Sequence, residues 1–214
     1  MLIQCIAHAK FLIETGNGYR IVTDPYDASC GFPVTPMKAD AVLVSHQHHD
    51  HNAVDTVSGW QTVVDKPGVH TLAPDITVRA VEACHDSEGG AKRGKTLLFS
   101  IRADGLNVVH LGDLGHVPDA EQIAALGPVD VLLIPVGGFF TIDAPTAREV
   151  CTLLKARVVI PMHYRTAQIP DWPIAPVDGF LSLFPWQAER LPILRVTAED
   201  LSLQPRLAVL EPQA

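Results

Sequence analysis

The first fifty residues alternate between short apolar runs and polar turns, a pattern that predicts a sheet. Leu2–Ile6, Phe11–Thr15 and Tyr19–Thr23 have the length and composition of strands, and Gly16-Asn17-Gly18 supplies the positive-φ residues of a tight hairpin. Ala41–Ser45 is a continuous apolar run bounded by polar residues, which is typical of a strand buried on both faces. The chain is therefore expected to open as a meander that leads into a covered sheet.

Strands and helices alternate through the middle of the chain. Further strands are predicted over Thr77–Cys84, Thr96–Arg102, Asn107–Leu111, Val129–Pro135 and Arg157–Pro161. Helices are predicted over Ala120–Leu126, where Asp119 and Gln122 resemble a capping box, and over Asp143–Lys155, where Asp143 is the N-cap. The last two strands and the helix between them form a strand, helix, strand unit with an expected right-handed crossover.

The segment from Ile169 onward is rich in proline and gives weaker signals. Asp178 is expected to cap a short helix that runs to Phe184, and Leu191–Thr197 is expected to form a strand. Because the whole chain has only 214 residues, we expect a single α/β domain over residues 1–214.

Composition and charge exclude several classes of function. Lys plus Arg number 16 and Asp plus Glu number 24, so the net charge of −8 repels phosphate backbones and no nucleic-acid partner is expected. The longest nearly apolar run, Val129–Phe140, is too short and too interrupted for a membrane span. The N-terminus lacks a basic region followed by a long apolar one, so a cytoplasmic protein is expected. Four scattered cysteines without a Cys-x-x-Cys pair are typical of reduced core thiols.

The segment His46-Gln-His-His-Asp-His51 places four potential metal ligands in six residues, directly after a predicted buried strand. In an extended segment, residues two apart point the same way, so His46 and His48 can reach one ion. The turn that follows can present Asp50 and His51 to a second ion. We therefore expect one short loop to serve two metals.

Further candidate ligands occur just past the ends of other predicted strands. His85, Asp113 and His163 each follow an apolar strand, and open α/β sheets gather ligands at such an edge. Each of these histidines alone is as typical of a buried core position as of a ligand. Asp24 also closes a predicted strand, and we expect its carboxylate to orient a ligand imidazole.

These residues resemble the motif of the metallo-β-lactamase fold hydrolases, His46-x-His48-x-Asp50-His51 followed by His85, Asp113 and His163. The resemblance covers about Leu2 to Thr166. It is greatest to the branch that contains ascorbate-phosphate lactonase and N-acyl-phosphatidylethanolamine phospholipase D. The segments that carry this finer likeness are Phe11–Thr15, Thr23–Pro25, His110–Gly115 and Pro161–Tyr164.

The resemblance implies a four-layer αββα sandwich with a dinuclear metal site at one edge. It implies that His46, His48 and His85 hold one ion, that Asp50, His51 and His163 hold the other, and that Asp113 bridges them. The expected ions are two divalent metals, zinc above all, with manganese or iron as alternatives. With Asp50, Asp113 and a bridging hydroxide the site would carry about one positive charge, which would attract an anionic small molecule and supply a nucleophile at neutral pH. A compact chain of this kind fits a small soluble ester, lactone or phosphoester.

Other residues are candidates for contact with the substrate. His8 follows the first strand, and a histidine at this position in the resembling branch lies near the pocket, so it joins Asp50 and Asp113 as a catalytic candidate. Lys92 and Arg93 lie in a glycine-rich turn after His85, where Arg93 could bind an anionic group. Tyr164 and Arg165 adjoin His163 and are candidates for an oxyanion donor and an anion clamp, and Gly137–Phe140 could line a pocket.

Two other functions fit the same residues. An oxidoreductase of this fold would use one iron on His46, His48 and His85, and a non-catalytic protein would keep the fold as a binding platform. The presence of Asp50, His51 and His163 favours the hydrolase over both. The sequence leaves the substrate and a homo-oligomeric state open.

Overall fold

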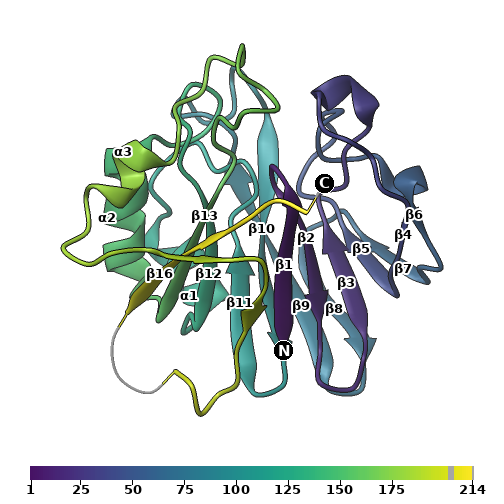
Figure 1. Cartoon of the computed structure of the whole chain (residues 1–214). Coiled ribbons are helices and arrows are strands. Elements are labelled where there is room, and N and C mark those ends of the chain that lie inside the picture. Colours follow the sequence, from purple (N-terminus) through teal and green to yellow (C-terminus); the bar gives the residue numbers. More distant parts are fainter. Residues whose placement is uncertain (202–204, 214) are drawn as a thin grey trace.

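The computed structural model describes residues 1–201 and 205–213, which form two large sheets packed face to face (Figure 1). The six-stranded sheet has the order β15 (Leu194–Arg195), β1 (Leu2–Ala7), β2 (Lys10–Glu14), β3 (Arg20–Thr23), β5 (Ala41–Leu43) and β7 (Thr62–Val64). The eight-stranded sheet has the order β14 (Glu189–Leu191), β16 (Arg206–Leu210), β13 (Val158–Met162), β12 (Val131–Pro135), β11 (Leu106–His110), β10 (Lys95–Ala103), β9 (Ile76–Cys84) and β8 (Gly68–Ala73).

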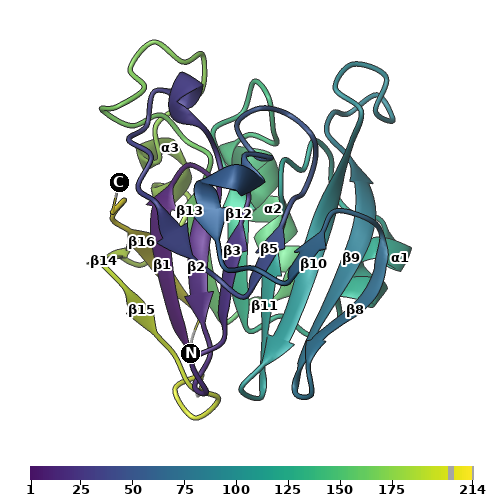
Figure 2. The same ribbon diagram turned by 90° about the vertical axis from the view of Figure 1, so that its right-hand side faces the viewer.

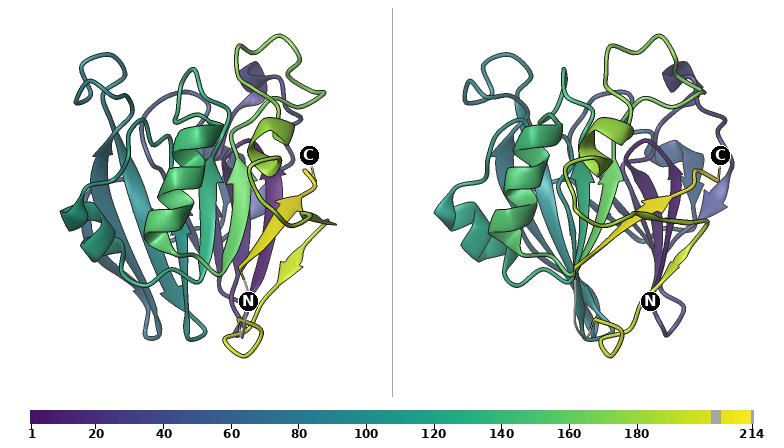
Figure 3. Two further views of the ribbon diagram at one scale, coloured as in Figure 1. Left: turned by 90° about the vertical axis from the view of Figure 1, so that its left-hand side faces the viewer. Right: turned by 60° about the vertical axis from the view of Figure 1, so that its left-hand side comes forward.

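Three helices cover the outer face of the eight-stranded sheet (Figure 3): α1 (Ala120–Leu126), α2 (Ala144–Leu154) and α3 (Asp178–Leu181). The predicted capping box of α1 is present, because the Asp119 side chain accepts from the Gln122 backbone and Gln122 bonds back. Asp143 caps α2 by accepting from the backbone N–H of Thr146 at 3.0 Å. None of the helices in the described part of the chain is long and apolar enough to cross a membrane.

The outer face of the six-stranded sheet is covered differently (Figure 2). The two-stranded sheet of β4 (Met37–Lys38) and β6 (Val57–Ser58) and the 3₁₀ helix Val54–Thr56 pack there. A second 3₁₀ helix, Ala28–Cys30, lies in the loop after β3. The expected mixed α/β fold is confirmed, but within residues 1–201 and 205–213 this layer contains 3₁₀ turns in place of α-helices.

The space between the sheets is the main apolar core. Phe11 and Ile13 of β2 pack with Phe99 and Ile101 of β10 and with many smaller aliphatic side chains. Strands β12 and β13 are buried over their full length, which explains their unbroken apolar sequences. Strands β11, β12 and β13 pair in parallel, so the loops that follow them emerge at the same edge, the upper edge in Figure 1.

The proline-rich C-terminal segment differs from the prediction. Leu191–Thr197 is not one strand, because β14 and β15 are separate and belong to different sheets. Pro192 lies between them and has no N–H for a strand ladder. Asp178 is the first residue of α3 and not its cap, because Val177 is at the N-cap without a side-chain hydrogen bond, and the helix ends at Leu181.

Two glycines allow loops at the upper edge to pack closely. A Cβ atom on Gly115 would lie 2.2 Å from the backbone nitrogen of Asp86 and 2.4 Å from the carbonyl carbon of His85. A Cβ atom on Gly137 would lie 2.3 Å from the backbone oxygen of His163. Both contacts are with backbone atoms, which cannot swing away, so only glycine fits. These contacts fix the backbone positions of His85 and His163.

We predict that Gly115→Ala destabilises the protein by about 1 to 3 kcal/mol, because the added methyl group forces the backbone at His85 and Asp86 to move. Gly179→Ala is the matched control: nothing lies within 4 Å of its added Cβ, and it lies in α3, where alanine is favoured by up to about 1 kcal/mol. Urea unfolding of the metal-free variants measures both. Equal midpoints for Gly115→Ala and the wild type would contradict the close-packing argument.

Candidate metal centre

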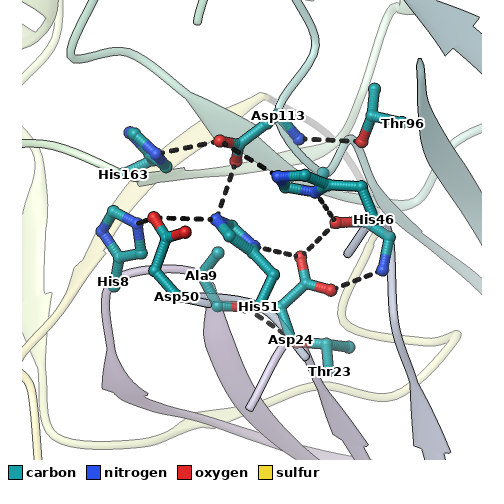
Figure 4. Close-up of polar contacts among 12 residues, drawn as sticks. His8, Ala9, Thr23, Asp24, His46, Asp50, His51, Thr96, Asp113 and His163 are labelled. Carbon is teal, nitrogen blue, oxygen red and sulfur yellow. Dashed lines mark hydrogen bonds and ion pairs between the residues drawn. The ribbon is translucent and has the colours of Figure 1, made fainter. Parts of the chain in front are cut away.

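Four segments of the chain bring histidine and aspartate side chains together at the upper edge of the sheets. Figure 4 shows the side chains of three of these segments, namely His46, Asp50 and His51, then Asp113, then His163. The loop after β5 contributes His46, His48, Asp50 and His51. The loops after β9, β11 and β13 contribute His85, Asp113 and His163 respectively, as expected from their positions past strand ends.

The candidate ligands divide into two main groups. His46, His48 and His85 form the first, which we call the His85 group. Asp50, His51 and His163 form the second, the His163 group, together with His8. Within each group, one ligand atom of every residue lies within 4.8 Å of the others. The family resemblance implies the same two sets for two ions, without His8.

Asp113 faces both groups, and Figure 4 shows it beside His46, His51 and His163. Its Oδ2 is 3.3 Å from Nε2 of His85 and 3.1 Å from Nε2 of His163, while its Oδ1 is 3.3 Å from Nε2 of His51. A single buried carboxylate therefore faces imidazoles of both groups.

The residues fit divalent metal ions. Nε2 of His46, Nε2 of His51 and Oδ1 of Asp113 are buried and have no hydrogen-bond partner among the described residues. Such atoms are costly to bury unless an ion satisfies them. Ligands bound at about 2.0 to 2.2 Å to one ion lie about 2.8 to 3.6 Å apart, and the separations around Asp113 of 3.1 to 3.3 Å fall in that range. Nitrogen and carboxylate donors suit zinc, manganese and iron alike.

Asp24 organises the loop that carries the motif. Its Oδ1 accepts from the backbone N–H of Ser45 and its Oδ2 accepts from the Ser45 hydroxyl, both at 2.7 Å. Nδ1 of His51 lies 2.9 Å from the same Oδ2, and Nδ1 of His46 lies 2.9 Å from the Ser45 hydroxyl oxygen. A carboxylate only accepts, and the hydroxyl proton is given to Asp24. Both imidazoles must therefore carry their proton on Nδ1, which leaves Nε2 free as a ligand.

Protonation states also favour metal binding. Burial raises the pKa of Asp113, but His163 and His51 outweigh burial and hold this pKa well below its usual value. Burial lowers the pKa of His46 to about 3, so this imidazole is neutral. Burial also opposes a charge on His51, but Asp113 and Asp24 raise the pKa of His51 well above its usual value. A bound cation would take the place of that proton.

His85 and His163 are held by backbone packing. Their Nδ1 atoms are buried without a hydrogen-bond partner in the part of the chain that the structure describes. Their positions follow instead from the contacts with Gly115 and Gly137. His163 has a φ of 52°, which ends the strand geometry of β13 and turns the imidazole into the site.

A cavity of about 440 Å³ opens onto these ligands. His48, Asp50, His85, Asp113 and His163 line its polar side. The remaining lining residues are His49, Arg93, Phe140, Asp171, Trp172 and Pro173. The cavity therefore joins a polar floor to a wall with two large aromatic rings, and its size suits a small molecule.

Asp86 holds Arg93 at this cavity. The Asp86 carboxylate accepts backbone N–H bonds from Glu88, Gly90, Lys92 and Arg93 at 2.8 to 2.9 Å. These bonds, the one from Arg93 above all, close the loop after His85 and hold the pKa of Asp86 well below its usual value. The Arg93 guanidinium lies 5.5 Å from the ring centre of Phe140 and forms no ion pair among residues 1–201 and 205–213.

Three residues predicted to contact substrate lie elsewhere. Tyr164 packs against the apolar cluster on the outer face of the eight-stranded sheet, because the left-handed backbone at His163 turns the next side chain away. Arg165 is exposed and does not line the cavity. His8 is buried beside the His163 group and does not line the cavity either.

Sequence reasoning missed other residues of the site. Trp172 and Asp171 come from the proline-rich C-terminal segment, whose role the sequence left open. Asp86 directly follows the candidate ligand His85 and precedes a glycine-rich turn. An aspartate in that position often accepts backbone hydrogen bonds from the turn, and this signal could have identified it.

We predict that Asp24→Asn lowers metal affinity by about 10- to 100-fold, because the amide cannot accept all three hydrogen bonds and no longer fixes the Nδ1 protons of His46 and His51. Asp55→Asn, at an exposed carboxylate in a 3₁₀ helix, is the control and keeps wild-type affinity. Competition with a chromophoric chelator measures both. Unchanged affinity in Asp24→Asn would exclude this role.

Comparison with known proteins identifies the family of the chain. Residues 2–163 match the model of the Beta-lactamase superfamily domain. A UPF0173 metal-dependent hydrolase of Carboxydothermus hydrogenoformans is 32% identical, over 83% of this chain and 88% of the relative. The crystal structure of a candidate Zn-dependent hydrolase of the metallo-β-lactamase superfamily from Thermotoga maritima is 38% identical, covers 99% of both chains and has a TM-score of 0.82.

A third likeness concerns the fold alone. Igni18, a metallo hydrolase of Ignicoccus hospitalis, is 23% identical with a TM-score of 0.66, over 99% of this chain and 95% of its own. Three observations point to the same superfamily: the match to the domain model, the identity to the curated relatives and the two donor groups. The chain therefore belongs to the metallo-β-lactamase superfamily and, within it, to the UPF0173 metal-dependent hydrolases.

Proposed function

We propose that the protein hydrolyses a small ester, lactone or phosphoester with two divalent ions, one in each donor group. The observation that carries this proposal is the position of Asp113, whose two carboxylate oxygens face imidazoles of the His85 group and the His163 group. A carboxylate that lies between two such groups is suited to bridge two ions.

In this proposal His46, His48 and His85 hold one ion, Asp50, His51 and His163 hold the other, and Asp113 contacts both. Two bound ions lower the pKa of a water molecule and polarise the carbonyl or phosphoryl group that is attacked. Asp50 and Asp113 supply two negative charges that offset part of the charge of the ions. Asp24 and Ser45 keep the Nδ1 protons in place, so that the free nitrogens point inward.

The cavity supports a small substrate that carries an anionic group. Arg93 lies at the cavity without a carboxylate partner in the described part of the chain, and Asp86 fixes its backbone. Phe140 and Trp172 offer rings against which an apolar part of the substrate can pack. Asp171 also lines the cavity, and its negative carboxylate disfavours a second anionic group on that side.

The C-terminal segment belongs to the same functional unit in this proposal. Trp172 reaches the cavity, β15 extends the six-stranded sheet, and β14 and β16 extend the eight-stranded sheet. A division after residue 163 would remove one wall of the cavity. A single domain over residues 1–214 is therefore the arrangement we favour.

We predict that Asp113→Ala reduces kcat by about 1,000-fold or more and lowers the metal content from about two ions per chain, because both groups lose a shared ligand. Elemental analysis and an assay panel of ester, lactone and phosphodiester substrates measure the two effects. Far-ultraviolet circular dichroism checks that the fold persists. Full turnover in Asp113→Ala, or one iron per chain with no hydrolysis in the wild type, would overturn the proposal.

We predict that Arg93→Met raises KM about 10- to 100-fold for an anionic ester such as nitrophenyl succinate and leaves a neutral ester of similar size unchanged. The methionine keeps an apolar stem but removes the charge. Lys92→Met is the matched control, because the exposed Lys92 side chain pairs with Glu88 and does not line the cavity. If both variants change KM for both esters equally, Arg93 does not select for charge.

A further inference from the structure

His8 is a buried histidine whose ring forms no hydrogen bond within the described residues. It is 5% exposed, and both ring nitrogens are buried without a hydrogen-bond partner among the residues that the structure describes. Burying an imidazole in this way removes two polar atoms from water, and no hydrogen bond from the described residues replaces the lost bonds to water. A neutral histidine in such a place needs either a water molecule or an ion.

The backbone turns His8 toward the site. The register of β1 and β2 shifts between Cys5 and Ala7, and His8 has a φ of 58° in the turn between the two strands. A non-glycine residue in this left-handed region carries strain, which tends to be retained at functional positions. The His8 carbonyl also accepts a bond from the backbone N–H of His163 at 3.3 Å, which ties the turn to the end of β13.

The free nitrogen of His8 points at the His163 group (Figure 4). Its Nε2 lies 3.3 Å from Oδ2 of Asp50, and Nε2 of His51 lies 3.4 Å from the same oxygen. The ring of His8 is centred 4.0 Å from that of His163. Ligand atoms of these four residues all lie within 4.8 Å of one another.

These separations suit ligands of one ion better than a direct hydrogen bond. Bonds between an imidazole and a carboxylate are about 2.7 to 2.9 Å when one partner is charged, and 3.3 Å is longer. Two ligands of one ion at about 2.0 to 2.2 Å lie about 2.8 to 3.6 Å apart, which includes both distances to Asp50.

Direct contact between His8 and substrate does not fit the structure. His8 does not line the cavity. Its ring is enclosed by His163, by Trp172 at 5.3 Å and by Phe32 at 5.8 Å between ring centres. A substrate would have to displace these side chains to reach it.

We propose that His8 is an additional protein ligand of the ion held by the His163 group. This inference rests on the two-ion function proposed above. With Asp50, His51, His163 and the shared Asp113, His8 brings the donors of this ion to five. The other ion has four, His46, His48, His85 and Asp113.

The two donor sets would be unequal. Five protein donors exceed the four of a tetrahedral zinc site, so the ion of the His163 group would have a higher coordination number than the ion of the His85 group. The cavity reaches both groups, because His48 and His85 line it together with Asp50 and His163.

Metal titration of His8→Gly tests the inference. Glycine tolerates the left-handed backbone at this position and leaves a space of imidazole size. Metal-free wild-type protein titrated with Co²⁺ is expected to bind two ions. His8→Gly is expected to bind one ion as the wild type does and the second at least 100-fold more weakly, with a changed visible spectrum of that second ion.

Added imidazole supplies the decisive measurement. Imidazole at millimolar concentration is expected to restore the second ion to His8→Gly and to leave wild-type binding unchanged. A role of His8 in folding alone would give no such rescue. His110→Asn is the control, because His110 is buried but bonds to the Ala9 carbonyl and the Gly112 N–H, and it keeps both ions whatever stability it loses.

Three results would overturn the inference: wild-type affinity for both ions in His8→Gly, equal weakening of both ions, or a change confined to KM. Failure of the two-ion function is distinguishable, because the wild type itself would then bind one ion. In that case His8 remains a ligand only if His8→Gly loses that single ion and imidazole restores it.

Discussion

The hydrogen bonds of the buried Asp24 carboxylate are the interaction on which the candidate metal centre depends. It is fully buried at the end of β3, and it accepts hydrogen bonds from the backbone and hydroxyl of Ser45 and from His51. Burial alone would raise its pKa, but His51 outweighs burial and holds this pKa below its usual value. Because the carboxylate can only accept, it decides which nitrogen of His51 and, through Ser45, of His46 carries a proton. One anion thus connects β3 to the loop after β5 and orients two candidate ligands.

The other ligands are positioned by steric exclusion. His85 and His163 follow strands whose loops pack directly against Gly115 and Gly137, where no side chain fits. Hydrogen bonds fix the orientation of an imidazole ring, whereas close backbone packing fixes the position of the residue's main chain. Three residues of the site, His8, Asp24 and His163, also have a positive φ without being glycine. That strain is tolerated because two packed sheets hold the loops from both sides.

Local sequence signals predicted the elements that depend on local physics. The capping box at Asp119 gave α1 its correct bounds, and Asp143 gave the start of α2. The prediction of one strand over Leu191–Thr197 was wrong because apolar composition does not show that the chain changes sheets after Pro192. The roles expected for Tyr164 and Arg165 rested on their adjacency to His163 in the sequence. His163 has a left-handed backbone, so the side chain of Tyr164 points to the outer apolar cluster and not to the cavity.

The sequence by itself determined the donor types, their order along the chain and their positions past strand ends, because ligand chemistry and strand periodicity are local properties. It also determined the family, since the spacing from His46 to His51 is specific. Only the tertiary structure decided that Asp113 faces both donor groups, that Trp172 lines the cavity and that His8 lies beside the His163 group without lining the cavity. Those relations join residues far apart in the chain, and their distances are set by how two sheets pack.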